Sequence, residues 1–220
     1  MLIPPNINTA PSNSPGGFGY ALITNYPGTL RNPAAATARI TGALADGTAF
    51  NQTVPVAQDG SVPIYANLYA GKGLLLGWIN LNLTNTNTVT VTGLTWIHPA
   101  RLTGTYPDGF TNILLTNEIL LSPWTNPPAN LGFLTNLFLL NTIDFTNTPI
   151  PVTITSGKVT GTSTTPVNGS VNLKTGLLTV TITSGTFKVT GHGAILLNSN
   201  DYGGGYLLNG PTDIAITLTR

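Results

Sequence analysis

Apolar and polar residues alternate with a period of two along most of this chain. Segments rich in Val, Ile, Thr and aromatic residues are bounded by Gly, Asn, Asp or Pro, a pattern typical of half-buried β-strands. The predicted strands cover 37–44, 61–69, 74–83, 88–97, 151–161, 177–184, 186–196 and 213–219. Helical patterning is weak because Thr and Asn are poor helix formers, and residues 131–140, the best helical candidate, favour a strand.

Short turn sequences separate several of these strands. The stretches "ADGT" (45–48), "VNGS" (167–170) and "TSGT" (183–186) place Gly after a small polar residue, which suits the positive φ of tight hairpins. The stretch "AGKG" (70–73) has a lysine among glycines but lacks the rest of a phosphate-binding loop, so it also indicates a hairpin turn.

One short motif recurs four times, as "ITG" at 40–42 and "VTG" at 91–93, 159–161 and 189–191. A glycine late in a strand permits a bulge or a sharp bend, which lets a long sheet curl. We therefore predict a single all-β domain over 18–220, either a long-stranded antiparallel β-barrel or a closed β-sandwich. Duplication into two similar halves, 18–110 and 150–219, stays open beside a chance repeat.

Residues 1–17 have a different character and predict an extended N-terminal arm. They are uncharged and contain prolines that disfavour a helix, and they end in the flexible sequence "SPGG". Such an arm could lie along the edge of a neighbouring subunit and add main-chain hydrogen bonds there. The residues expected to make this contact are Leu2, Ile3, Pro4, Pro5 and Ile7.

Charge and cysteine content exclude several function classes. Only 7% of the 220 residues are charged and the net charge is +1, so colloidal repulsion opposes self-association weakly. The eight Lys and Arg residues are scattered, which argues against a nucleic-acid partner. Without cysteine the chain has neither disulfides nor thiolate sites. We expect no membrane span, because every apolar run is short, and any export signal would have been removed or would lie upstream.

The stretches "LTWIHPA" (94–100) and "YPDGF" (106–110) hold the most conspicuous candidate chemistry. If the alternation persists, Leu94, Trp96 and His98 share one face of a strand. His98 could then act as a base beside an aromatic platform, but no nucleophile motif accompanies it. The simpler interpretation is a buried strand that reaches the sheet edge at His98, with 106–110 as the following turn.

Catalytic and metal-binding patterns are otherwise weak. Neither histidine lies in a metal-ligand spacing, so we predict no cofactor, with a structural calcium ion in the loops left open. Glu118 with Asp144 or Asp201 could form a glycosidase pair, although the spacing does not support one. We therefore predict a non-enzymatic protein, with a glycoside hydrolase as the alternative.

Aromatic residues in loops are the remaining binding candidates. Trp78 follows three leucines and is expected in the core, whereas Trp124 in "SPWTNPP" is expected in a loop. The candidate ligand-binding residues are Trp124, Tyr202, Tyr106, Asp108 and His98.

The order of several motifs resembles a β-rich module near the C-terminal ends of large secreted proteins of environmental bacteria. These motifs are the "ADGT" hairpin, the "PIY" and "GLLLGW" strands, "WIHPA", "YPDGF" and the closing "GYLL". The resemblance covers most of residues 18–219, and the family has no established activity. His98 stands where the resemblance implies a lysine.

Two functions follow as predictions. The first is an extracellular or cell-surface structural or adhesive subunit that forms a homo-oligomer or polymer through strand edges or its arm, since weakly charged Thr-rich and Val-rich strands lack protection against edge pairing. The alternative is a carbohydrate-binding module that binds glycans through loop aromatics.

Overall fold

The computed structural model describes most of the chain, with gaps in the loops. The described residues are 1–4, 15–26, 36–81, 88–114, 117–120, 122, 124, 137–142, 149–161, 166–197, 201–210 and 212–219. They form antiparallel strands and one single-turn 3-10 helix, η2 (Tyr69–Gly71). The predicted all-β class is therefore confirmed, and the described chain contains both a pair of packed sheets and a closed barrel.

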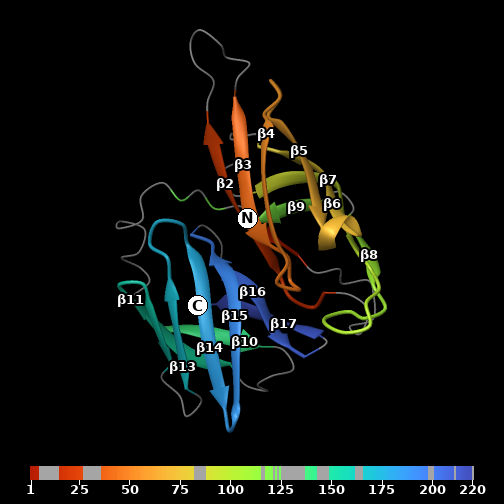
Figure 1. Cartoon of the computed structure of the whole chain (residues 1–220). Helices are drawn as coiled ribbons and strands as arrows, with labels where there is room; N and C mark the ends of the chain where they lie inside the picture. The colour runs from red at the N-terminus through yellow and green to blue at the C-terminus, as the bar shows by residue number, and fades with distance from the viewer. Residues whose placement is uncertain are drawn as a thin grey trace.

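The first part of the chain forms two sheets that share one hydrophobic core, here called the sandwich (Figure 1). The first sheet has the order β1 (Leu2–Ile3), β2 (Gly19–Tyr26), β3 (Thr37–Ala43) and β4 (Ala49–Pro55). The second contains β5 (Ser61–Leu68), β6 (Gly73–Asn80), β7 (Thr88–His98), β8 (Phe110–Leu114) and β9 (Asn117–Leu120), the last two both pairing with β7. Alternate residues of β3 and β5 are buried, as the period-two pattern predicts.

A side-chain amide joins the two sheets of the sandwich where β4 meets β5. Gln52 donates from Nε2 to the carbonyl of Pro63 at 3.2 Å and accepts at Oε1 from the amide of Tyr65 at 2.9 Å. Because a primary amide offers the same donor and acceptor as a peptide group, Gln52 replaces part of a missing backbone ladder. The facing edges of β4 and β5 are thus bridged at this point.

The second part of the chain forms an eight-stranded closed barrel with its own hydrophobic core. Its strands are β10 (Leu137–Thr142), β11 (Ile150–Thr155), β12 (Lys158–Gly161), β13 (Val167–Val171), β14 (Leu177–Ser184), β15 (Phe187–Ile195), β16 (Asp201–Asn209) and β17 (Thr212–Thr219). Pairing of β10 with β17 closes the barrel, so its strands have no free sheet edge.

The sandwich and the barrel meet around the start of β2. The amide of Phe18 donates to the carbonyl of Gly205 in β16 at 3.0 Å, and the ring of Tyr20 stacks on that of Tyr206 at 6.4 Å. Asp213 of β17 accepts hydrogen bonds from the backbone amides of Gly16 and Gly17 at 3.0 and 2.6 Å. These contacts fix the entry of the chain into β2 against the barrel wall.

Most of the predicted turns are confirmed and one is wrong. Residues 45–48, 70–73 and 183–186 turn between successive strands as expected. Residues 167–170 instead lie within β13, which pairs with strands on both sides. The reason is steric, because a Cβ at Gly169 would lie 2.2 Å from the carbonyl oxygen of Thr179. The glycine is needed there for close approach of two strands rather than for a turn.

The glycines of the recurring motif have different local roles. Gly93 lies at a register shift between β6 and β7, as the bulge prediction requires. A Cβ at Gly42 would lie 2.1 Å from the carbonyl oxygen of Tyr20, and one at Gly191 would lie 2.4 Å from Ile216. These two positions therefore require the absence of a side chain. The described strands of the two predicted halves differ in arrangement, and duplication stays a prediction.

Candidate functional site

His98 is the last residue of β7, as the sequence predicts, and its side chain points into the sandwich. Leu94, Trp96 and His98 are all buried, at 1%, 5% and 3% exposure. The chain then leaves the sheet and returns through the turn at 106–109 into β8. The interpretation of "LTWIHPA" as a buried strand that ends at a sheet margin is therefore confirmed.

A network of polar groups surrounds the imidazole. Nε2 of His98 lies 3.5 Å from Oδ2 of Asp46, in the turn between β3 and β4. The same carboxylate accepts from the amide and hydroxyl of Thr48, each at 2.8 Å, and from the hydroxyl of Tyr69 at 2.7 Å. The indole of Trp96 donates to the Tyr69 oxygen at 2.9 Å. Asp46 therefore connects three segments that are distant in sequence.

Aromatic rings enclose His98 on several sides. The ring centroid of Tyr69 lies 4.6 Å from that of His98, Phe110 stacks on it at 5.3 Å, and Tyr106 approaches edge-on at 5.8 Å. Among the described residues, Nδ1 of His98 and the hydroxyl of Tyr106 are buried without a hydrogen-bond partner. An unpaired buried polar atom lowers stability, which makes this cluster a place of local energetic cost.

The protonation of the network follows from its geometry. Burial alone would raise the pKa of Asp46, but hydrogen bonds from His98, Tyr69 and Thr48 outweigh it, and the pKa lies below its usual value. Burial, followed by the negative charge of Asp46, raises the pKa of Tyr69. At neutral pH the carboxylate is therefore ionised and the phenol is a neutral donor.

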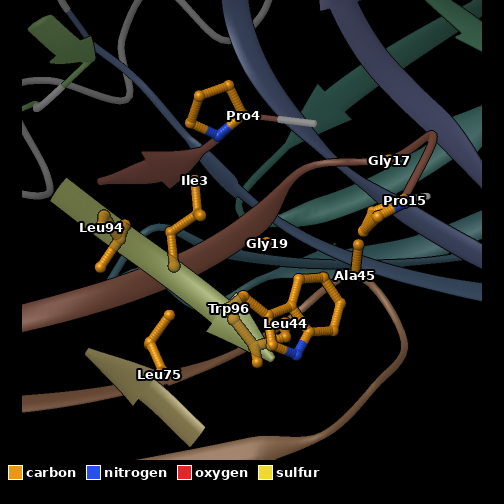
Figure 2. Close-up of a pocket in the computed structure, with 10 residues that line it drawn as sticks. All are labelled: Ile3, Pro4, Pro15, Gly17, Gly19, Leu44, Ala45, Leu75, Leu94 and Trp96. Atoms are coloured by element: carbon orange, nitrogen blue, oxygen red, sulfur yellow. The ribbon is translucent and has the colours of Figure 1, made fainter. Parts of the chain in front are cut away.

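A small cavity touches this cluster at Trp96, and its lining does not include His98, Asp46 or Tyr69. The cavity beside Trp96, shown in Figure 2, measures about 10 Å³, and Ile3 and Leu94 are among the residues that line it. That volume is about the minimum that holds one water molecule. The polar groups bond to one another, so we interpret the His98–Asp46–Tyr69 network as structural.

Of the other ligand-binding candidates, the structure brings Tyr106 against His98. Tyr106 is buried at 1% exposure, whereas Asp108 is exposed in the adjoining turn. Tyr202 lies in β16, but its side chain is outside the described residues. Trp124 lies far along the chain and contacts the barrel, with Nε1 donating to the carbonyl of Leu173 at 3.0 Å.

The candidate carboxylate pair cannot be placed. The side chains of Glu118, Asp144 and Asp201 lie outside the described residues. Within the described part of the chain, no group of three or more His, Cys, Asp or Glu side chains could hold a metal ion. The absence of an enzymatic activity and of a cofactor stays a prediction.

The start of the expected arm folds back on the chain's own sandwich. Leu2 and Ile3 pair with Tyr20 and Gly19 of β2 and are buried at 5% and 6% exposure. Leu2 and Ile3 therefore contact their own chain rather than extending freely, and Ile3 joins the sandwich core. Their contact with a neighbouring subunit stays a prediction. Pro4 is half-buried, and Pro5 and Ile7 lie outside the described residues.

An aromatic site that the sequence prediction missed lies on the outer face of the second sheet. Trp78, expected in the core, is 52% exposed there. It lines a hollow of about 310 Å³ together with Ser61, Ile79, Asn80, Thr90 and Thr92. Tyr65, 61% exposed, belongs to the outward-facing residues of the neighbouring strand β5. The sequence held a signal, because in "WINLNL" Asn80 and Asn82 have the parity of Trp78.

A β-bulge between β6 and β7 lies next to Trp78. The register between β6 and β7 shifts between Leu76 and Trp78, where Gly77 has φ +152° and Gly93 has φ +59°. A Cβ on Gly77 would lie 2.7 Å from Cα of Leu94. The bulge therefore changes which residues of β7 point inward, from Val91 before it to Leu94 after it.

Comparisons of the chain with protein-family models, curated proteins and solved structures found no match. The resemblance to a secreted bacterial module therefore stays a prediction. The extracellular or cell-surface location also stays a prediction. Among the described residues, the fold contains no helix with the length and apolarity needed to cross a membrane.

Proposed function

We propose that this protein is a carbohydrate-binding module that holds a neutral glycan on the outer face of β5, β6 and β7. The observation that carries the proposal is the exposed ring of Trp78 in a hollow of polar side chains. An indole offers a large, rigid apolar surface at low entropic cost, which suits the apolar face of a sugar ring.

The neighbours of Trp78 supply the directional groups that a sugar requires. In register, Trp78 lies opposite Thr92, and Asn80 lies opposite Thr90 on one side and Ser61 on the other. Asn80 donates from Nδ2 to the carbonyl of Asp59 at 3.2 Å and to the hydroxyl of Ser61 at 3.4 Å, which orients its amide. Hydroxyls and an oriented amide can exchange hydrogen bonds with sugar hydroxyls.

The chemistry of the hollow favours an uncharged ligand. Its lining residues carry hydroxyl, amide, aliphatic and indole groups, without an acidic or basic side chain. The site rests on paired strands rather than on loops, so binding would cost little conformational entropy. Tyr65, diagonally placed on β5, extends the aromatic surface and would contact a second sugar ring.

Self-assembly through strand edges, the other predicted function, is less well supported by the described edges. The barrel is closed, Gln52 bridges β4 and β5, and Leu2 and Ile3 cover part of β2. Self-assembly therefore stays a prediction. Light scattering of the full chain over a range of concentrations would test it.

The experiment that tests the glycan proposal is calorimetric titration with neutral oligosaccharides selected from a glycan array. We expect saturable binding that Trp78→Ala weakens at least tenfold, about 1.4 kcal/mol, with a smaller loss for Tyr65→Ala. The matched control is Tyr26→Ala, which removes a similarly exposed ring from β2 and should leave affinity unchanged. Circular dichroism verifies folding of each variant. An array without any saturable ligand, or equal affinity in Trp78→Ala, would overturn the proposal.

A further inference from the structure

A larger cavity lies between the sandwich and the barrel, on a different part of the molecule from Trp78. Its volume of about 600 Å³ falls within the range of small-molecule binding sites. Residues 21–25 of β2 line it from the sandwich, and Leu177 and Ile195 line it from the barrel. Trp124 and the turn that follows β13 also line it.

The wall formed by Trp124 is held in place by specific contacts. Besides the hydrogen bond from its indole to Leu173, its ring lies against Gly176, where a Cβ would come within 2.7 Å of the ring. Gly176 has φ +73°, so the turn itself also favours glycine. Nearby, the hydroxyl oxygen of Ser122 accepts from the amide of Leu197 at 2.7 Å. This part of the cavity is therefore formed before any ligand arrives.

The same turn positions the side chain of Lys174 at the cavity. The amide of Lys174 donates to Oδ1 of Asn172 at 2.9 Å, and the amide of Gly176 donates to the Asn172 carbonyl at 2.8 Å. Lys174 lines the cavity and is exposed, and the lining includes no carboxylate. Within the described part of the chain, the Lys174 ammonium has no acidic partner.

The remaining lining is mainly apolar. The aliphatic members are Met1, Ala21, Leu22, Ile23, Leu81, Leu177 and Ile195, and the neutral polar members are Thr24, Asn25, Ser122 and Thr175. Aliphatic walls with one unpaired cation complement a ligand that has an apolar body and one anionic group. A sugar would leave many hydroxyls facing aliphatic groups, which costs free energy.

We propose that this cavity binds a single-chain aliphatic carboxylate, with the hydrocarbon chain against Leu22, Leu177 and Ile195 and the carboxylate paired with Lys174. Desolvation of the chain supplies the affinity, and the ammonium selects the charged head. This binding is independent of the glycan proposal, since the two linings share no residue.

The test uses dodecanoate below its micelle concentration as the probe, with dodecanol and dodecylamine as head-group controls. Calorimetry should show saturable binding of dodecanoate, at least tenfold tighter than either control. Lys174→Met keeps the aliphatic stem and removes the charge, so it should reduce dodecanoate affinity at least tenfold and leave dodecanol affinity unchanged. Lys158→Met, an exposed lysine on β12, is the matched control and should bind like the parent chain.

The position of bound dodecanoate in the protein is tested separately by methyl NMR. Addition of dodecanoate should shift the methyl signals of Leu22, Ile23, Leu177 and Ile195, and Trp78→Ala should leave both the shifts and the affinity unaltered. No saturable binding, equal affinity for dodecanol, unshifted methyl signals at these residues, or equal losses in the two lysine variants would each overturn the proposal.

Discussion

The inner and outer faces of the second sheet both place a tryptophan beside polar groups, but those groups are enclosed on the inner face and accessible on the outer face. The inner face places Trp96 and His98 against Tyr69 and Asp46, and these polar groups bond mainly to one another. The outer face exposes Trp78 above hydroxyls and an amide that border an open hollow. An aromatic residue beside polar groups therefore indicates a binding site only where the polar groups are accessible and space remains.

The largest expected effect tests whether the inner network stabilises the fold. Asp46→Ala removes the acceptor for Thr48 and Tyr69 and the partner of His98, so we expect a loss of about 3 kcal/mol in the free energy of unfolding. Urea denaturation measures this loss.

Asp59→Ala is the matched control for that experiment. The carboxylate of Asp59 makes the same local pair of bonds, from the amide and hydroxyl of Ser61, but it is exposed and, among the described residues, accepts no bond from a distant segment. Its loss should be much smaller. Similar losses in the two variants would show that only the local turn bonds matter and that the buried network adds nothing.

The second prediction is that the stability contributions of the two buried carboxylates, Asp213 and Asp46, depend on pH in opposite directions. Burial, opposed by hydrogen bonds from Gly16 and Gly17, raises the pKa of Asp213 from 3.8 to about 6. Since the folded pKa exceeds the unfolded one, the stabilisation from the protonated form is complete below about pH 4. It is lost as pH rises through about 6, at most about 3 kcal/mol. Asp46, whose pKa is lowered, has the opposite sign and loses its contribution as pH falls.

Unfolding free energies measured from about pH 2 to 7 for the parent chain and Asp213→Asn test this difference. The asparagine variant should lose the decline between pH 4 and 6 and keep the loss at acid pH that Asp46 produces. Parallel profiles for the two proteins would contradict the assignment to Asp213.

The smallest effect concerns the unpaired hydroxyl inside the aromatic cluster. Tyr106→Phe removes a buried group without a partner among the described residues, so it should stabilise the fold by about 1 kcal/mol. Tyr69→Phe, which loses bonds to Asp46 and Trp96, should instead destabilise it by about 1–2 kcal/mol. Thermal unfolding measures both, and a destabilised Tyr106→Phe would mean that this hydroxyl has a partner after all.

Local pattern predicted much of the fold and little of the site. Alternation correctly placed Leu94, Trp96 and His98 on one buried face, and turn chemistry placed most of the hairpins. The contact of His98 with Asp46 depends on how two sheets pack, which no local spacing encodes. Trp78 was assigned to the core because three leucines precede it, whereas the parity of Asn80 indicated the outer face.

The pairing of β10 with β17 also has a consequence for the order of folding. Every other strand pair of the barrel joins neighbours in sequence, but this pair joins its first and last strands and must overcome the largest loop-closure entropy. During synthesis β10 therefore cannot pair with β17 until the whole barrel segment has left the ribosome. The amides that join β17 to β10 should accordingly acquire hydrogen-exchange protection later than those that join β17 to β16 in pulse-labelled refolding, and simultaneous protection would contradict this order.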